Sequence, residues 1–334
     1  MKRKYLLTIL AAMISALCIG CAGSPSEDEQ AKEAAPVIAK GETITIDNVC
    51  EFRIQDIDFT KEPEHYHKAE SGKTYVEVSI VYKNLTDEDV WAENIAEGKL
   101  LYSGKYEYVG VARSGEDDKE SLTYTYSRTV KPQKTEYIYY FFSVPEEIQG
   151  SDGAIELDLS ICDNDYCVIE REGTKEPPSD EKDSGETGKT SGAVESGETV
   201  VTENCEFYVD FAKITKDIRP TKPGEAYVYF SADTGMTFID LCVAYKNTSD
   251  QHIRADKSVS AKLKLSEDNT CKASHLVETN GRAGLDYAGE AYIIPLCTEY
   301  VHCVFQVPEE EAEDLEHVEI SFKVDGHSYS YLIP

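Results

Sequence analysis

The chain has 334 residues and a formal net charge of −30 at pH 7, because 63 acidic residues outnumber 33 basic ones. Binding to nucleic acid requires clustered lysine and arginine, so this balance argues against DNA or RNA as a partner. It also disfavours docking on anionic lipid headgroups and favours solubility. A chain of this length fits two domains of ordinary size.

The first twenty residues have the pattern of a secretory signal peptide. Residues 2–4 are basic, residues 5–19 are mostly apolar, and the small Gly20 precedes Cys21. The apolar stretch is short for a membrane span and has the flanks of a secretory h-region. We therefore expect export from the cytoplasm, and no later segment of the sequence is apolar enough to span a bilayer.

Residues 17–21, Leu-Cys-Ile-Gly-Cys, resemble a bacterial lipoprotein box, with Cys18 where leucine is usual. The resemblance implies lipidation of Cys21. Each buried methylene contributes about 0.8 kcal/mol, so two or more acyl chains hold a protein durably at a membrane. The expected location is extracytoplasmic, lipid-anchored to the outer face of the bacterial cell membrane, with the lipid as the only membrane contact. Signal cleavage without lipid is the alternative.

Composition divides the rest of the chain. Residues 172–196 are rich in Glu, Lys, Asp, Ser, Thr and Gly and contain almost no apolar side chain, so they cannot offset the entropy of ordering. The predicted order is a signal peptide (1–20), a disordered tether (21–40), a first folded copy (41–171), an acidic polar linker (172–196) and a second folded copy (197–334).

One long pattern occurs twice. Thr74–Asn84 reappears as Thr237–Asn247, and Thr135–Glu147 reappears as Thr298–Glu310, both at an offset of 163. The region between the two segments therefore has equal length in both copies. Such a repeat indicates two domains of one architecture.

The repeated segments alternate with a period of two. Glu77 and Asp240 occupy intervening positions, and the apolar positions of the first copy are Val76, Val78, Ile80 and Tyr82. This alternation predicts strands of antiparallel sheets, with one face buried and the face of Glu77 and Asp240 in solvent.

Turn signals complete the fold prediction. Asp325-Gly326 predicts a tight hairpin between residues 320–324 and 327–331. Extra residues at 215–237 predict an inserted ribbon or loop in the second copy. Each copy contains about seven to nine short strands and no long amphipathic helix. The predicted fold class is all-β, with two tandem immunoglobulin-like antiparallel β-sandwiches joined by the disordered linker.

Two features carry a family resemblance. They are the strand ends at 82–86 and 245–249 and the Phe-x-Val-Pro-Glu-Glu segments at 142–147 and 305–310. The chain resembles the immunoglobulin-like domains of unknown function found in tandem on lipoproteins of Gram-positive bacteria, which are similar in fold to a small secreted mycobacterial antigen. The resemblance implies the fold of both copies and supplies no catalytic residue.

One pair of cysteines suggests a disulfide. If residues 164–165 form a two-residue turn, Cys162 and Cys167 face each other where Cα atoms approach to about 4.5 Å, and a disulfide fits. Two free thiols are the alternative. Cys50 and Cys205 occupy matching places in the two copies and are expected to be small core residues.

Patterns for catalysis and metal binding are weak. Gly185–Thr190 lacks one glycine of a phosphate-binding loop and falls in the polar linker. His65 and His67 are more typical of a solvated loop than of a metal site. The sequence contains neither Gly-x-Ser-x-Gly nor His-Glu-x-x-His. We therefore expect no enzymatic activity, no cofactor and no metal.

Tyrosine is the remaining feature. Three Tyr-x-Tyr segments of the first copy each place two phenols on one strand face, and aromatic side chains on a solvated face can contact sugars or proteins. The alternative is that tyrosine suits half-buried strands. The candidate binding face consists of Tyr106, Tyr108, Tyr124, Tyr126, Tyr137, Tyr139 and Trp91.

These observations favour a non-enzymatic binding module whose partner is a protein or glycan of the cell envelope. One alternative is a structural spacer or an accessory subunit of an envelope transporter or sensor. A weaker alternative is a redox or metal-handling domain that uses the cysteines and histidines.

Overall fold

In the computed structural model, the described residues are 35–64, 66–115, 122–174, 191–265, 270–313 and 319–333. The signal peptide, Cys21, His65, Gly185–Thr190 and most of the tether and linker lie outside these ranges. In the described part of the chain, no helix has both the length and the apolar character that a membrane crossing requires.

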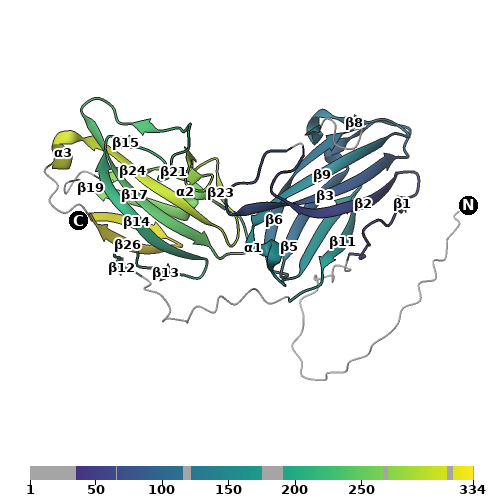
Figure 1. Ribbon diagram of the computed structural model, residues 1–334, viewed down its shortest axis with the longest axis horizontal. Helices are drawn as coiled ribbons and strands as arrows, with labels where there is room; N and C mark the ends of the chain where they lie inside the picture. Colours follow the sequence, from purple (N-terminus) through teal and green to yellow (C-terminus); the bar gives the residue numbers. More distant parts are fainter. Residues whose placement is uncertain are drawn as a thin grey trace, which may run out of the picture. The chain divides into compact units, whose positions relative to one another are not determined.

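The first copy consists of strands with short helical turns between them. Two 3₁₀ turns span Ala92–Asn94 (η1) and Thr125–Ser127 (η2), and α1 spans Glu147–Gly150. Figure 1 shows the long strands β2, β3 and β9 side by side. The strands are β1 (Ile44–Ile46), β2 (Cys50–Thr60), β3 (Lys73–Asn84), β4 (Val90–Trp91), β5 (Ala96–Tyr102), β6 (Tyr106–Gly115), β7 (Thr123–Tyr124), β8 (Thr129–Val130), β9 (Thr135–Pro145), β10 (Ile155–Ile161) and β11 (Asn164–Arg171).

These strands form two sheet regions that share one strand. One region has the order β2-β3-β9-β6 and the other β5-β10-β11. Strand β6 belongs to both, because its first half pairs with β5 and its second half with β9. The first copy is thus a β-sandwich in which strands far apart in the sequence, such as β2 and β9, belong to one sheet.

The second copy repeats this order. Its helices are α2 (Ala255–Ser258) and α3 (Glu309–Glu313). The strands are β12 (Gly192–Ala193), β13 (Val200–Val201), β14 (Cys205–Thr215), β15 (Asp217–Ile218), β16 (Phe230–Ser231), β17 (Met236–Asn247), β18 (Ile253–Arg254), β19 (Val259–Lys264), β20 (Thr270–Lys272), β21 (Ser274–Thr279), β22 (Gly284–Tyr287), β23 (Tyr292–Ile293), β24 (Thr298–Pro308), β25 (Glu319–Val324) and β26 (His327–Leu332).

One sheet of the second copy runs β14-β17-β24-β21 and the other β26-β25-β19-β20. Here the strand shared by both sheets in the first copy is divided at Ala273 into β20 and β21. The all-β prediction is confirmed, and both copies have the predicted antiparallel sheets. The exact domain boundaries drawn from composition stay a prediction.

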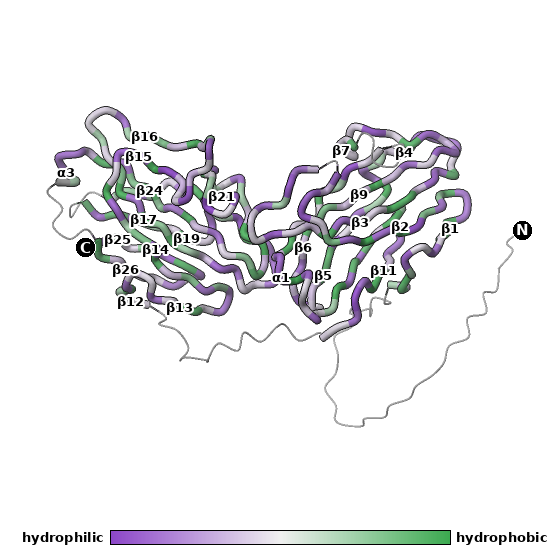
Figure 2. The backbone as a smooth tube through the Cα atoms, in the orientation of Figure 1, coloured by the Kyte–Doolittle hydropathy of each residue, from purple (hydrophilic) through white to green (hydrophobic). Residues whose placement is uncertain are grey.

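The repeated alternation builds the core of each sandwich. Val76, Val78, Ile80 and Tyr82 are fully buried in one core, and their counterparts on β17 are buried in a second core. In Figure 2 the green of hydrophobic residues recurs along the strands of both copies. Burial of apolar surface at about 25 cal/mol per Å² is the main force holding these sheets together.

The prediction of a solvated outer face is wrong for this sheet of the second copy. Asp240 is fully buried and β17 is shielded on both sides. The reason is the insertion predicted at 215–237, which forms the β15–β16 ribbon. Its Ile218 packs with Phe238 and Leu276 in a small second apolar cluster on the outer side of the sheet.

In the first copy the same face is partly covered. The loop residue Tyr66 packs against a cluster that contains Tyr75, Tyr139 and Phe141. The Tyr66 and Phe141 rings are stacked with centroids 4.4 Å apart. Glu77 therefore lies beside a covered patch and is half-buried.

The hairpins follow one geometry. Asp325 and Gly326 have φ angles of 49° and 79° and connect β25 to β26, as predicted. In the first copy, the turn is formed by Cys162 and Asp163, with φ angles of 47° and 61°. The predicted turn at residues 164–165 is wrong by two residues, because both central positions of this turn require positive φ and the chain places them at 162–163.

Candidate functional site

The structure divides the predicted tyrosine face. Tyr106 and Tyr108 are buried, because they lie opposite Tyr102 and Leu100 of β5 on the core side of the sheet. Tyr139 is also buried. The prediction of a solvated face is therefore wrong for these three tyrosines.

Other aromatic residues of that set remain accessible. Tyr137 is half-buried, whereas Trp91, Tyr124 and Tyr126 are 49%, 50% and 59% exposed. The Tyr124 and Tyr126 rings are stacked with centroids 5.1 Å apart, and the Arg113 guanidinium lies 3.6 Å from the Tyr124 centroid. Trp91 in β4 pairs with β8, which follows η2 directly. These three form the exposed aromatic group of the first copy, and its binding role stays a prediction.

The predicted Cys162–Cys167 disulfide does not match the register. Because the turn lies at residues 162–163, Cys167 is opposite Asp158 across the β10–β11 pair. Cys162 instead approaches Cys50, with 3.7 Å between the two Sγ atoms. Cys50 is a fully buried core residue, as predicted.

His67 is exposed, and its ring centroid lies 3.9 Å from that of Tyr66. Within the described ranges, no group of three or more His, Cys, Asp or Glu side chains is arranged to hold a metal ion.

A buried charged cluster was missed by sequence reasoning. His302 of β24 lies between two carboxylates: its Nδ1 is 2.9 Å from Asp240 Oδ1, and its Nε2 is 3.6 Å from Glu278 Oε1. The Cys242 Sγ is 3.8 Å from the same Nε2. Sequence alternation placed Asp240 on the outer face of its strand, but only the covering ribbon explains why it is buried.

The same cluster fastens the inserted ribbon to the sheet. Glu278 accepts hydrogen bonds from the backbone N–H of Thr221 at 2.7 Å and from its hydroxyl at 2.5 Å. Arg282 pairs with Glu278, with Asp210 at 2.6 Å, and with the Thr221 hydroxyl at 2.9 Å. Charge-assisted hydrogen bonds of this kind are stronger than neutral ones.

Burial and neighbouring charges shift the pKa values of His302, Glu278 and Cys242. Burial by itself lowers the pKa of His302, but the buried Asp240 carboxylate outweighs it, so the net pKa lies well above 6.5. Burial raises the pKa of Glu278, but hydrogen bonds from His302, Thr221 and Arg282 lower it to about 2. Burial also raises the pKa of Cys242, which favours the neutral thiol.

The order Asp240–His302–Cys242 is that of a nucleophilic triad. All three side chains are fully buried, so in this conformation they have no surface at which a substrate could meet the thiol. The arrangement is suited to holding the ribbon in place.

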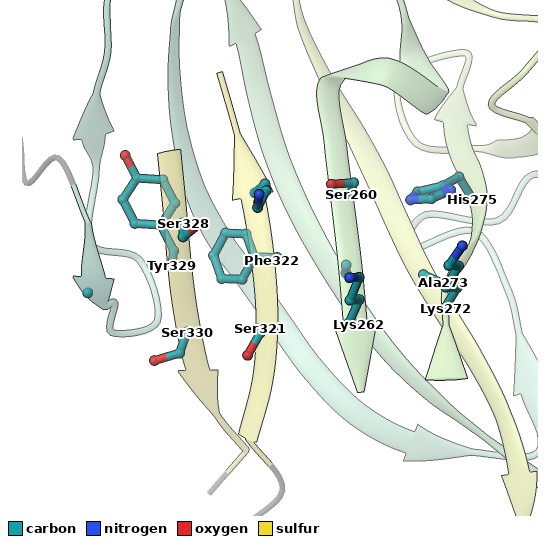
Figure 3. A pocket seen from close by; sticks show the side chains of 13 residues that line it. Ser260, Lys262, Lys272, Ala273, His275, Ser321, Phe322, Ser328, Tyr329 and Ser330 are labelled. Carbon is teal, nitrogen blue, oxygen red and sulfur yellow. The ribbon is translucent and has the colours of Figure 1, made fainter. Parts of the chain in front are cut away.

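An open groove lies on the outer face of the other sheet of the second copy. Its volume is about 680 Å³, and it is lined by residues of β19, β20, β25 and β26. Figure 3 shows polar side chains from these four strands along the groove. We call the following residues the Ser/Lys face: Ser260, Lys262, Lys272, Ser321, Lys323, Ser328 and Ser330.

Period-two alternation positions the Ser/Lys face. Ala261, Phe322 and Tyr329 point into the core, so the serines and lysines beside them point outward. The register sets Lys262 between Lys272 and Ser321, and sets Lys323 between Ser260 and Ser328. One row across the face reads Lys272, Lys262, Ser321 and Ser330, and the neighbouring row reads Ser260, Lys323 and Ser328, so each row carries both ammonium and hydroxyl groups.

The lysines of this face lack acidic partners. Among the described residues, the ammonium groups of Lys262, Lys272 and Lys323 form no ion pair and no hydrogen bond, although the chain as a whole is strongly acidic. His275 also lines the groove, and its buried Nε2 has no hydrogen-bond partner. Burial lowers the pKa of His275, which favours the neutral ring. The groove thus offers donors to an anionic, oxygen-rich ligand.

Comparison with known proteins gives limited results. No family model matches the chain, and no curated protein matches it. One similar structure is an uncharacterized β-sandwich protein from Clostridium difficile 630, at 23% identity over 46% of this chain and 100% of the other, with a TM-score of 0.40. Another is a candidate lipoprotein, ycdA, from Bacillus subtilis, at 12% identity over 43% of this chain and 40% of the other, with a TM-score of 0.25. At such TM-scores, neither likeness carries an argument about function.

Proposed function

We propose that this chain is a lipid-anchored, extracytoplasmic binding protein whose Ser/Lys face takes up a phosphate-bearing glycan polymer of the cell envelope. The observation that carries the proposal is a groove with three lysines that have no acidic partner in the described part of a chain whose net charge is −30. The signal pattern and Cys21 support the location.

The chemistry of the face is compatible with phosphate groups. Lysine binds phosphate as a point charge, whereas the arginine fork recognises carboxylate and phosphate alike in a bidentate manner. The residues that line the groove include Lys262, Lys272 and Lys323 but no arginine. Serine hydroxyls between them can bond to the hydroxyls of a sugar or polyol.

The strength of the contacts favours a polymer over a small ion. An exposed ion pair contributes about 0.2–1 kcal/mol, so three of them supply no more than about 3 kcal/mol. That is weaker than the about 4 kcal/mol of a millimolar site. A chain with repeated phosphates gains from several simultaneous contacts and from effective concentration at the membrane.

The overall negative charge does not forbid such binding. At physiological ionic strength the Debye length is about 8 Å, so an approaching phosphate senses mainly the groups of the groove. Long-range repulsion by the rest of the protein slows association without removing the local contacts.

The exposed aromatic group of Trp91, Tyr124 and Tyr126 supports a second candidate function, the binding of an envelope protein through the first copy. Exposed aromatic side chains with a neighbouring arginine are typical of protein contact sites. A spacer or accessory subunit would use the same surface.

Sedimentation with insoluble cell-wall fragments tests the main proposal. The mature ectodomain is mixed with fragments that retain their phosphate polymers and with fragments stripped of them, at 50 and 300 mM NaCl. We expect cosedimentation only with the intact fragments at low salt. The combined variant Lys262→Gln, Lys272→Gln and Lys323→Gln should lose it.

A matched variant controls for net charge. Lys105, Lys131 and Lys134 are exposed lysines of the first copy, and their replacement by glutamine removes the same charge. This control should sediment like the wild type. Equal sedimentation with stripped fragments, or equal loss in both triple variants, contradicts the proposal. Binding that disappears only with Tyr124→Ala and Tyr126→Ala supports the aromatic group instead.

A further inference from the structure

Two cysteines of the first copy meet where the two sheets come together. Cys50 begins β2 in one sheet, and Cys162 occupies the β10–β11 turn of the other. They are 112 positions apart in the chain, yet their Sγ atoms are 3.7 Å apart. Cys50 is fully buried and Cys162 is half-buried, so one thiol is accessible and the other lies directly behind it.

The second copy ties the same two elements together by other means. Asp325 occupies the position of Cys162 in the corresponding turn. Its carboxylate accepts hydrogen bonds from the Asn204 backbone N–H at 3.1 Å and from the Asn204 side-chain amide at 3.0 Å. Cys205, the counterpart of Cys50, contacts the Thr202 hydroxyl at 3.2 Å. A contact between the start of β2 or β14 and the turn that joins the last two strands is therefore common to both copies.

We propose that Cys50 and Cys162 form a disulfide that links β2 to the β10–β11 turn after export. The link joins the two sheets covalently at the place where the second copy uses the Asp325–Asn204 hydrogen bonds. Disulfides form in extracytoplasmic compartments, where an oxidant is present.

The reaction is a two-step thiol–disulfide exchange with a protein or small-molecule disulfide as oxidant. The Cys162 thiolate attacks one sulfur of the oxidant, forms a mixed disulfide and releases one thiolate of the oxidant. The Cys50 thiolate then attacks Cys162 Sγ and releases the second. Two electrons and the two thiol protons pass to the oxidant, which leaves as two thiols.

The environment of the pair suits this order of events. Hydrogen bonding with Cys50, aided by contact with Tyr82, outweighs the effect of burial, which raises the pKa, and lowers the pKa of Cys162 to about 7. The same hydrogen bond and burial raise the pKa of Cys50. A thiol with a pKa near ambient pH is the better attacking group, and Cys162 is also the more accessible one.

The test is peptide mapping without reduction. The mature protein is equilibrated in oxidised and reduced glutathione mixtures, its thiols are blocked by alkylation in denaturant, and its peptides are identified by mass spectrometry. We expect a linked peptide pair that contains Cys50 and Cys162 under oxidising conditions. Reduction should lower the Tm of the wild type and leave that of Cys162→Ser unchanged.

Matched variants distinguish loss of the disulfide from loss of the folded structure. Cys162→Ser lies at a half-exposed turn and is expected to fold even if the buried Cys50→Ala does not. Cys205→Ala, the counterpart of Cys50 in the second copy, should leave the linked peptide intact. Complete alkylation of both Cys50 and Cys162 under oxidising conditions would refute the proposal, as would a Cys162–Cys167 linkage.

Discussion

His302 Nδ1 lies 2.9 Å from Asp240 Oδ1, and both side chains are completely shielded from solvent beneath the inserted ribbon. Breaking a buried pair of this kind is costly, because the remaining charge loses its nearest partner in a medium of low dielectric, and His302 then keeps only Glu278, whose Oε1 lies 3.6 Å from its Nε2. The matching positions of the first copy are Tyr139 and Glu77, so the histidine of this pair has no counterpart there.

Removing one partner should therefore destabilise the second copy strongly. Asp240→Asn is expected to lower the free energy of unfolding by about 3–5 kcal/mol, the usual cost of breaking a buried ion pair. Urea unfolding measures this change. Asp286→Asn, at an exposed position of β22, is the control and should change the value by less than about 0.5 kcal/mol. Equal small losses in both variants would show that the His302 pair is not ionised.

The pH dependence of stability has two limbs. Because folding raises the pKa of His302 above 6.5, its contribution is complete below pH 6.5 and is lost as the pH rises through the folded-state pKa. Because folding lowers the pKa of Glu278 from 4.5 to about 2, its contribution is complete above pH 4.5 and is lost as the pH falls towards 2. Denaturation midpoints measured from pH 2 to 9 should peak between pH 4.5 and 6.5.

Replacing Glu278 by glutamine should flatten the acid limb. The variant has no carboxylate at this position, so the loss of stability between pH 4.5 and 2 becomes smaller than in the wild type. An unchanged acid limb would assign that loss to other carboxylates.

The ribbon should loosen when its hydrogen bonds to Glu278 are weakened. Thr221→Val removes the hydroxyl that donates to Glu278 and accepts from Arg282, at a cost of about 1–3 kcal/mol for the unsatisfied groups. Hydrogen exchange should become faster at residues 217–231 and stay unchanged in β3. Uniform acceleration throughout the second copy would instead indicate that the ribbon is not a separate unit.

Substitution of a buried tyrosine should lower the stability of the first copy, because these side chains fill its core. Tyr108→Ala leaves a cavity in the first core and should cost about 3–5 kcal/mol, as for other large aromatic side chains. Tyr126→Ala removes a ring that is 59% exposed and should change stability by less than about 0.5 kcal/mol. Thermal unfolding of the two variants distinguishes these cases.

Much of the fold could be read from the sequence. The offset of 163 and the period-two alternation of Val76 to Tyr82 identified β3 and its counterpart β17, and Asp325-Gly326 identified the last hairpin. Those signals are local and repeated, so a single sequence carries them twice. The same offset applied to the first hairpin would have given its turn at residues 162–163 in place of 164–165.

The buried tyrosines, the charged cluster and the Ser/Lys face depend on contacts between segments that are distant in the sequence. The alternation of Tyr106-Glu-Tyr108 allows the tyrosines to face either the core or the solvent. Only the pairing with β5 shows that they face the core. Asp240, Glu278 and His302 come from three different strands, and nothing local marks their meeting. The Ser/Lys face had a visible signal, the alternation of Ser321-Phe-Lys323 beside that of Ser328-Tyr-Ser330, which gains meaning only through the register of β25 and β26.

Titration of the mature ectodomain with a soluble polyol phosphate of defined length tests the binding proposal most directly. At 50 mM salt we expect saturable binding that weakens at least tenfold at 200 mM salt and is absent in the Lys262, Lys272 and Lys323 glutamine variant. Binding that is unaffected by salt, or that persists in this variant while the Lys105, Lys131 and Lys134 control behaves in the same way, would contradict an anion-binding Ser/Lys face.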